Sequence, residues 1–127
     1  MSRSHLFVYG TLRPGDVRWH LLAPFVVDRG WPDSTSGQLY DTGLDYPAAV
    51  FGGNSTIHGE SFALIEPSIE QALALLDEVE DTVGGEYTRV TVTTRRGITA
   101  WAYAYGAGLA LTPIASGDWL QHRPLPA

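Results

Sequence analysis

The sequence predicts an α+β fold in which one main helix accompanies a mixed, barrel-like sheet. Short apolar or alternating segments, typical of strands, recur along the chain. A single segment has the length and spacing of a strong helix. A chain of 127 residues suits one domain with a buried core. We therefore expect residues 1–127 to form a single domain with a partly loose tail over residues 115–127, anchored by Trp119.

Three strands are expected before the helix. The run Leu6–Tyr9 is apolar and stops at Gly10, which indicates a short buried strand. Pro47 biases the residue before it toward an extended conformation, so we expect the turn-rich stretch 42–56 to cross the surface by an irregular path. The other two strands are predicted over residues 37–41 and 57–65.

The helix is predicted over residues 66–81, where good helix formers follow Pro67 in the first turn. The pair Gly84-Gly85 frees the backbone to turn and ends it. Alternating segments on either side of a short Arg-Arg-Gly turn then predict a hairpin, with strands over residues 86–94 and 98–108.

One carboxylate of this helix falls on its apolar face. At about 100° per residue, Ile69, Leu73 and Leu76 share one stripe, and Glu80 falls within roughly 20° of Ile69. Burial disfavours the charged form and would raise the pKa of Glu80 toward the range useful to a general acid or base. Two other interpretations stay open: the helix frays before Glu80, or Glu80 accepts a hydrogen bond from Arg89 or a tyrosine hydroxyl.

Composition excludes several classes of function. The chain has no cysteine, which excludes disulfides, thiolate metal sites and cysteine nucleophiles. The net charge of −6 argues against a nucleic-acid surface or an anionic membrane. No apolar run approaches the ~20 residues of a membrane span, and the N-terminus does not resemble a secretory signal, so a cytoplasmic protein is expected.

Motifs for other chemistries do not occur in the sequence. His58 and Glu60 lie two apart, but no metal-binding spacing such as H-E-x-x-H occurs, and we expect no metal site. The serine-hydrolase elbow G-x-S-x-G and the glycine loops that bind phosphate are also missing.

Several motifs in order resemble the gamma-glutamylcyclotransferase-like (AIG2-like) family, closest in pattern to the gamma-glutamylamine cyclotransferases. The residues Tyr9-Gly10-Thr11-Leu12 match the N-terminal Tyr-Gly-Ser/Thr-Leu/Asn motif of that family. Glu80 closes the Leu-Asp-x-x-Glu segment, followed by Tyr-x-Arg at 87–89. Further similarity lies in residues 37–50, 59–60, 100–105 and 116–119, so the resemblance runs from Leu6 to Trp119.

The resemblance implies a mixed barrel-like fold and a cofactor-free gamma-glutamyl cyclotransferase. In that reaction the α-amine of a γ-glutamyl group attacks its own γ-carbonyl, which releases an amine and 5-oxoproline. Ring closure gains from proximity, so no protein nucleophile is required. The resemblance assigns Glu80 as acid and base. The backbone N–H groups of residues 9–12, with the Thr11 hydroxyl and Tyr105, would bind the substrate.

The sequence leaves several points open. A non-catalytic small-molecule-binding or interaction domain of the same fold is the alternative function. The leaving amine could belong to a free peptide, a γ-glutamylamine or a capped biosynthetic intermediate, because loops shape its pocket. The oligomeric state and any contact of the substrate with Arg13, Tyr87, Arg89 or Tyr103 also stay open.

Overall fold

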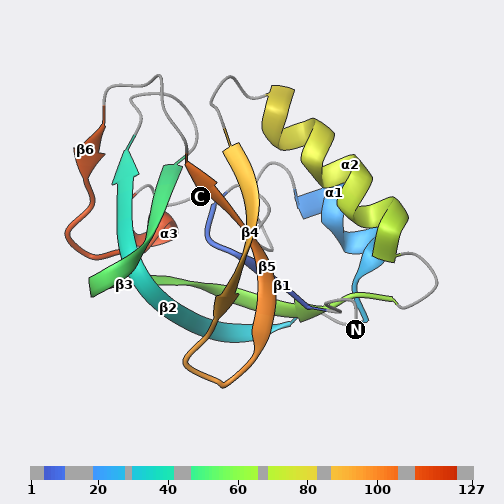
Figure 1. Ribbon diagram of the computed structural model, residues 1–127, viewed down its shortest axis with the longest axis horizontal. Coiled ribbons are helices and arrows are strands. Elements are labelled where there is room, and N and C mark those ends of the chain that lie inside the picture. The colour runs from blue at the N-terminus through green and yellow to red at the C-terminus, as the bar shows by residue number, and fades with distance from the viewer. Residues whose placement is uncertain are drawn as a thin grey trace.

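The protein folds as one six-stranded mixed sheet that curls into a half-barrel, with its long helix packed across one side (Figure 1). This computed structural model describes residues 5–10, 19–27, 30–41, 47–65, 69–82, 87–105 and 111–122. For residues 77–82, 87–88, 105 and 120 it describes the backbone only. The architecture confirms the predicted α+β class and the barrel-like sheet.

The strand order across the sheet is β4-β5-β1-β3-β2-β6. The pairing of β1 with β5 is parallel and the other pairings are antiparallel, so the sheet is mixed. The strands are β1 His5–Val8, β2 Trp31–Asp41, β3 Pro47–Ala63, β4 Tyr87–Thr93, β5 Thr99–Tyr105 and β6 Thr112–Pro113. The helices are α1 Trp19–Leu22, a 3-10 turn at Ala23–Phe25, α2 Ile69–Thr82 and α3 Trp119–His122. The predicted hairpin is confirmed as β4 and β5, whose register pairs Tyr87 with Tyr105 and Thr93 with Thr99.

Strands β2 and β3 are longer than the sequence predicts. The irregular path expected for residues 42–56 is wrong from Pro47 onward, because β3 begins there and pairs residues 47–51 with 37–41 of β2. The register then shifts between Ser36 and Gly37, and Thr56 resumes the pairing opposite Ser36. Local turn signals predicted a loop, but pairing with β2 satisfies the backbone groups of this stretch and makes it a strand.

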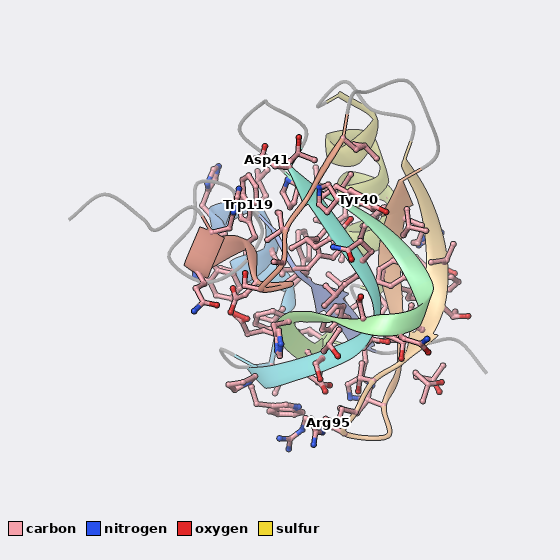
Figure 2. The ribbon with its side chains drawn as sticks, turned by 90° about the vertical axis from the view of Figure 1, so that its left-hand side faces the viewer. Tyr40, Asp41, Arg95 and Trp119 are labelled. Atoms are coloured by element: carbon pink, nitrogen blue, oxygen red, sulfur yellow. The ribbon has the colours of Figure 1, made fainter. Side chains whose placement is uncertain are left out.

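The hairpin turn between β4 and β5 reaches across to β2, a strand that is not its neighbour in the sheet order. The Arg95 amide donates to the Ser34 carbonyl at 2.8 Å, and the Thr35 hydroxyl donates to the Thr93 carbonyl at 3.1 Å. Figure 2 shows Arg95 at the end of the molecule opposite Tyr40 and Asp41. These bonds therefore draw β2 and the β4–β5 turn together at one end of the half-barrel.

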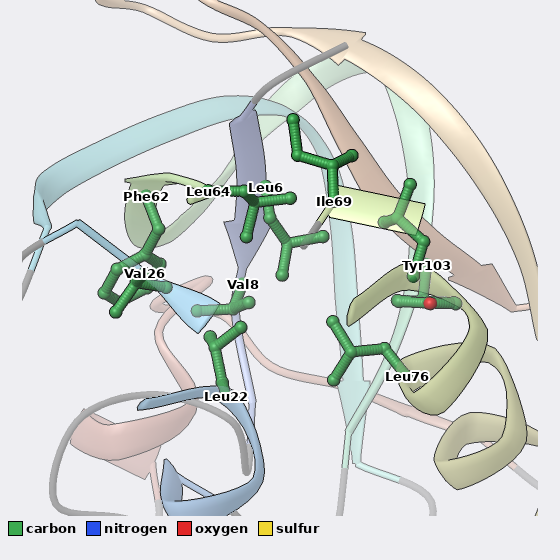
Figure 3. Close-up of a cluster of buried hydrophobic side chains, with 10 residues drawn as sticks. Leu6, Val8, Leu22, Val26, Phe62, Leu64, Ile69, Leu76 and Tyr103 are labelled. Atoms are coloured by element: carbon green, nitrogen blue, oxygen red, sulfur yellow. The ribbon is translucent and has the colours of Figure 1, made fainter. Parts of the chain in front are cut away.

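Two hydrophobic clusters lie on the two sides of the sheet. The first lies between the sheet and helices α1 and α2, where β1 contributes Leu6 and Val8 and α2 contributes Ile69, Leu73 and Leu76 (Figure 3). The second lies inside the curled sheet and takes the alternate residues of β1, β3 and β5 together with residues of β2 and β4, among them Phe7, Tyr9, Leu39, Ile57, Val92 and Ala102. Alternate residues of a strand point to opposite faces, so β1 contributes to both clusters.

The C-terminal segment closes the concave side of the sheet. Ile114 and Trp119 are buried in the inner cluster, which confirms Trp119 as the anchor of the tail. Gly117 has a φ of +67°, and a Cβ there would lie 1.9 Å from the Thr56 carbonyl oxygen, so only glycine fits this turn. The Gly117 carbonyl accepts a bond from the His58 amide at 2.8 Å, so this part of the tail is tied to β3 rather than loose.

Candidate active site

The site begins where β1 ends, at two residues of the Tyr-Gly-Thr-Leu motif. Tyr9 is buried in the inner cluster, and its ring meets Phe51 edge-on at a centroid distance of 6.1 Å. Its hydroxyl donates a hydrogen bond of 2.5 Å to the backbone carbonyl of Tyr103 on β5. The phenol therefore fixes the end of β1 to β5.

Gly10 lies against the first residue of β3. A Cβ at position 10 would lie 2.8 Å from Cγ and 2.9 Å from Cδ of Pro47, closer than a carbon contact tolerates. The family resemblance places Gly10 in the backbone segment that would bind the substrate, and the structure adds Pro47 as a packing reason for the missing side chain. The other predicted motif residues, Thr11 and Leu12, lie outside the described residues, as does Arg13.

The last turn of helix α2, which carries the predicted acid/base position, lies at the same end of the molecule as the end of β5 (Figure 1). Its residues Ile69, Leu73 and Leu76 are all buried, which confirms the apolar stripe expected from their spacing. The backbone is helical through Thr82, so the alternative interpretation that the helix frays before Glu80 is wrong. Position 80 therefore continues this stripe one turn beyond Leu76, while the Glu80 side chain lies outside the described part of the chain.

Arg89 lies on β4, the strand that contacts α2. It pairs in register with Tyr103 of β5. The Arg89 guanidinium lies over the Trp101 ring, 4.6 Å from the ring centroid, as in a cation–π contact. Trp101 in turn packs against the cluster under α2, so the guanidinium is held on the helix side of the sheet.

The strand ends therefore gather four of the motif positions. Tyr9, Arg89 and Tyr103 are joined through adjacent strands, and position 105 ends β5 beside them. In Figure 1 the end of β5, the start of β4 and the last turn of α2 all lie at the top of the molecule. Tyr103 is buried in the core, while the side chains of Tyr105 and Tyr87 lie outside the described residues.

Two contributors to this site escaped the sequence analysis. Trp101 lies below the Arg89 guanidinium, and Pro47 packs on Gly10. The position of Trp101 could have been found from the alternation of β5, because residues 101 and 103 share a face and Arg89 pairs with residue 103. No local signal could have found Pro47, which lies 37 residues from Gly10 in the chain.

Metal-binding groups do not gather in this region. Within the described ranges, no three His, Asp, Glu or Cys side chains lie close enough together to hold a metal ion. His58 is exposed on β3, and its neighbour in the alternation, Glu60, is half-buried. In the part of the chain that the structure describes, no helix is long and apolar enough to cross a membrane.

Comparison with known proteins identifies similar sequences over most of the chain. A family model described as "Gamma-glutamyl cyclotransferase, AIG2-like" matches residues 6–121. The "Gamma-glutamylcyclotransferase family protein ytfP" of Citrobacter rodentium is 39% identical over 122 residues, which cover 91% of this chain and 94% of that protein.

Solved structures show the same fold. The uncharacterized protein PH0828 from Pyrococcus horikoshii superposes with a TM-score of 0.70 at 27% identity, covering 96% of this chain and 93% of that one. An AIG2-like protein from Mus musculus superposes with a TM-score of 0.58 at 19% identity, covering 98% of this chain and 92% of that one, a likeness of fold.

Proposed function

Since this chain belongs to the gamma-glutamyl cyclotransferase, AIG2-like family, we propose that it cleaves a γ-glutamyl amide by cyclising the glutamyl group. The α-amine attacks the γ-carbonyl carbon and forms the C–N bond of the lactam ring. The C–N bond to the leaving amine breaks, so the products are 5-oxoproline and a free amine or amino acid. The two reacting groups belong to one molecule, so the reaction depends on orientation and proton transfer.

The family match across residues 6–121 carries this proposal, because it spans the Tyr-Gly-Thr-Leu motif, the helix and the β4–β5 hairpin together. The geometry supports it in two ways. The end of β1 is held in place by the hydrogen bond from the Tyr9 hydroxyl to β5 and by the packing of Gly10 against Pro47. The α2 backbone stays helical through position 80.

Each candidate residue then has a distinct role. Glu80 takes a proton from the α-ammonium group and returns one to the leaving nitrogen. The backbone N–H groups of residues 9–12, with the Thr11 hydroxyl, bind the glutamyl α-carboxylate or the developing oxyanion. Tyr105 contacts the substrate, whereas Tyr103 is a positioning residue because its carbonyl accepts the Tyr9 hydroxyl.

The test is 5-oxoproline release from a panel of γ-glutamyl amines, γ-glutamyl peptides and ε-(γ-glutamyl)-lysine. Glu80→Gln keeps the size of the side chain but cannot accept the proton, so we expect at least a roughly hundredfold loss of kcat. Glu70→Gln is the matched control, because Glu70 is an exposed glutamate in the first turn of the same helix. We expect this variant to keep the wild-type rate.

The outcomes separate the possible functions. Turnover of any panel member that requires Glu80 but not Glu70 supports the proposal, and the best substrate begins to define the leaving amine. Equal turnover by wild type and Glu80→Gln would show that another group moves the protons. Binding of panel members without turnover by the folded wild type would favour a non-catalytic ligand-binding domain.

A further inference from the structure

A pocket open to solvent lies at the end of the half-barrel opposite the candidate active site, where the end of β4 meets the middle of β2. Its volume is about 270 Å³. Thr93 lies six residues from Tyr87 along β4, so roughly 20 Å of strand separates the cavity from the candidate active site. The residues that line this seam pocket are Ser34, Thr35, Ser36, Thr56, Thr93, Thr94 and Arg95.

The lining of the seam pocket is chemically uniform. Six of the seven residues carry a hydroxyl group and the seventh, Arg95, carries a guanidinium. Hydroxyl groups can donate hydrogen bonds to an anion, and a guanidinium is always charged and offers donors in a planar fork. Among the described residues that line the pocket there is no acidic side chain. The Thr35 hydroxyl already donates to the Thr93 carbonyl at 3.1 Å, so the donors that could meet an anion are the other hydroxyl groups and the Arg95 guanidinium.

The nearest carboxylate in the sequence, Asp33, has its oxygens engaged elsewhere. One oxygen of this buried side chain accepts from the Ser34 amide at 2.8 Å and the Arg96 amide at 3.2 Å. The other accepts from the Ser61 hydroxyl at 2.6 Å. Both Asp33 oxygens therefore accept hydrogen bonds from backbone N–H groups or from Ser61 of β3, and not from the Arg95 guanidinium. The guanidinium can then interact with a ligand in the pocket.

Arg95 has a fixed backbone and an exposed side chain. Its amide bonds to the Ser34 carbonyl at 2.8 Å, and the turn around it is closed by a 2.9 Å bond from the Gly97 amide to the Thr94 carbonyl. No acidic side chain of the described residues forms an ion pair with its guanidinium. In contrast, the Arg96 guanidinium lies over the Trp31 ring, 5.1 Å from its centroid. The two adjacent arginines are thus held in different surroundings, and Arg95 is the one that lines the pocket.

We propose that the seam pocket binds the phosphate group of a small phosphate monoester. A guanidinium fork with several hydroxyl donors suits the oxygens of a tetrahedral dianion. The volume leaves room for a few atoms beyond the phosphate but is below the usual range for larger ligands. The net charge of −6 repels anions at long range, so binding depends on this local set of donors.

The test is a titration of the ¹⁵N-labelled full chain with glycerol 3-phosphate, followed by amide chemical shifts. We expect saturable shifts in residues 34–36, 56 and 93–97, and no such shifts with glycerol or with sodium chloride at matched ionic strength. Inorganic phosphate shows whether the phosphate group alone accounts for binding. Arg95→Gln should weaken binding at least tenfold, and Thr56→Val, which keeps the shape but removes a hydroxyl, should weaken it severalfold.

The control variant is Arg96→Gln, which removes the same charge one residue away and should change affinity by less than about threefold. Equal losses for Arg95→Gln and Arg96→Gln would overturn the proposal, because long-range attraction alone would explain them. Shifts that grow linearly without saturating, or that sodium chloride reproduces, would overturn it as well. Acetate binding as tight as that of glycerol 3-phosphate would overturn phosphate recognition, because it would show that the pocket binds small carboxylates equally well.

Discussion

Gly10→Ala perturbs the contact that holds the motif strand end against β3. The added Cβ would lie 2.8 and 2.9 Å from two ring carbons of Pro47, where ordinary contacts begin at 3.4 Å. About half an ångström of movement is therefore needed, in a ring that has little freedom to move. Gly10 is not among the glycines with positive φ, so alanine is compatible with the backbone there. The contact with Pro47 is what decides the effect.

The expected size follows from two opposing effects. Overpacking of this kind costs about 1–3 kcal/mol of folding free energy. Replacing glycine by alanine restricts the unfolded chain and returns about 0.4–1 kcal/mol. We therefore expect Gly10→Ala to lower the free energy of unfolding by about 1–2 kcal/mol.

A double-mutant cycle with Pro47→Ala isolates the contact. Pro47→Ala removes the two ring carbons, so in that background Gly10→Ala should no longer destabilise and should instead stabilise by about 0.4–1 kcal/mol. The assay is urea unfolding followed by the fluorescence of the four tryptophans, for the wild type, the two single variants and the double variant. Their unfolding midpoints report stability directly when the m-values of the four proteins agree.

Two results would refute this reasoning. An unchanged unfolding midpoint for Gly10→Ala would mean that the strand end moves away from Pro47 without cost. Additive effects of the two substitutions, with a coupling below about 0.5 kcal/mol, would mean that the cost of the new methyl group arises elsewhere.

Three further substitutions test the core and the buried carboxylate. Leu76→Ala should lower the free energy of unfolding by about 2–5 kcal/mol, because the Leu76 side chain is fully buried under the sheet. The neighbouring Leu75 side chain is half-buried, so Leu75→Ala should cost about half as much in the same unfolding assay. A smaller loss for Leu76 than for Leu75 would contradict the packing of α2. Asp33→Asn should lower the free energy of unfolding by about 1–3 kcal/mol. The asparagine oxygen can accept from the two backbone N–H groups, but its NH₂ group cannot accept the hydrogen bond that the Ser61 hydroxyl now donates. An unchanged thermal unfolding midpoint would show that these hydrogen bonds contribute little to stability.

Much of the fold was predictable from local patterns. The alternation of residues 86–94 and the Arg-Arg-Gly turn predicted the β4–β5 hairpin, and the spacing of Ile69, Leu73 and Leu76 predicted the buried face of α2. These predictions succeed because a strand or helix shows its buried side at intervals of two or about four residues. The first half of β3 was missed, because Pro47 and the following glycines read as turns while its pairing partner lies elsewhere in the chain.

The order and spacing of residues by themselves determined the class of fold, the family and the candidate acid/base position. Tertiary structure alone decided which groups meet: the Tyr9 hydroxyl bonds to a carbonyl 94 residues away, and Gly10 packs on Pro47. The curl of the sheet, also a tertiary feature, brings Arg95 to Ser34, where both residues line the seam pocket. The physical reason is that periodicity reports which side of an element is buried, whereas strand pairing and curl arise when distant backbone groups satisfy one another.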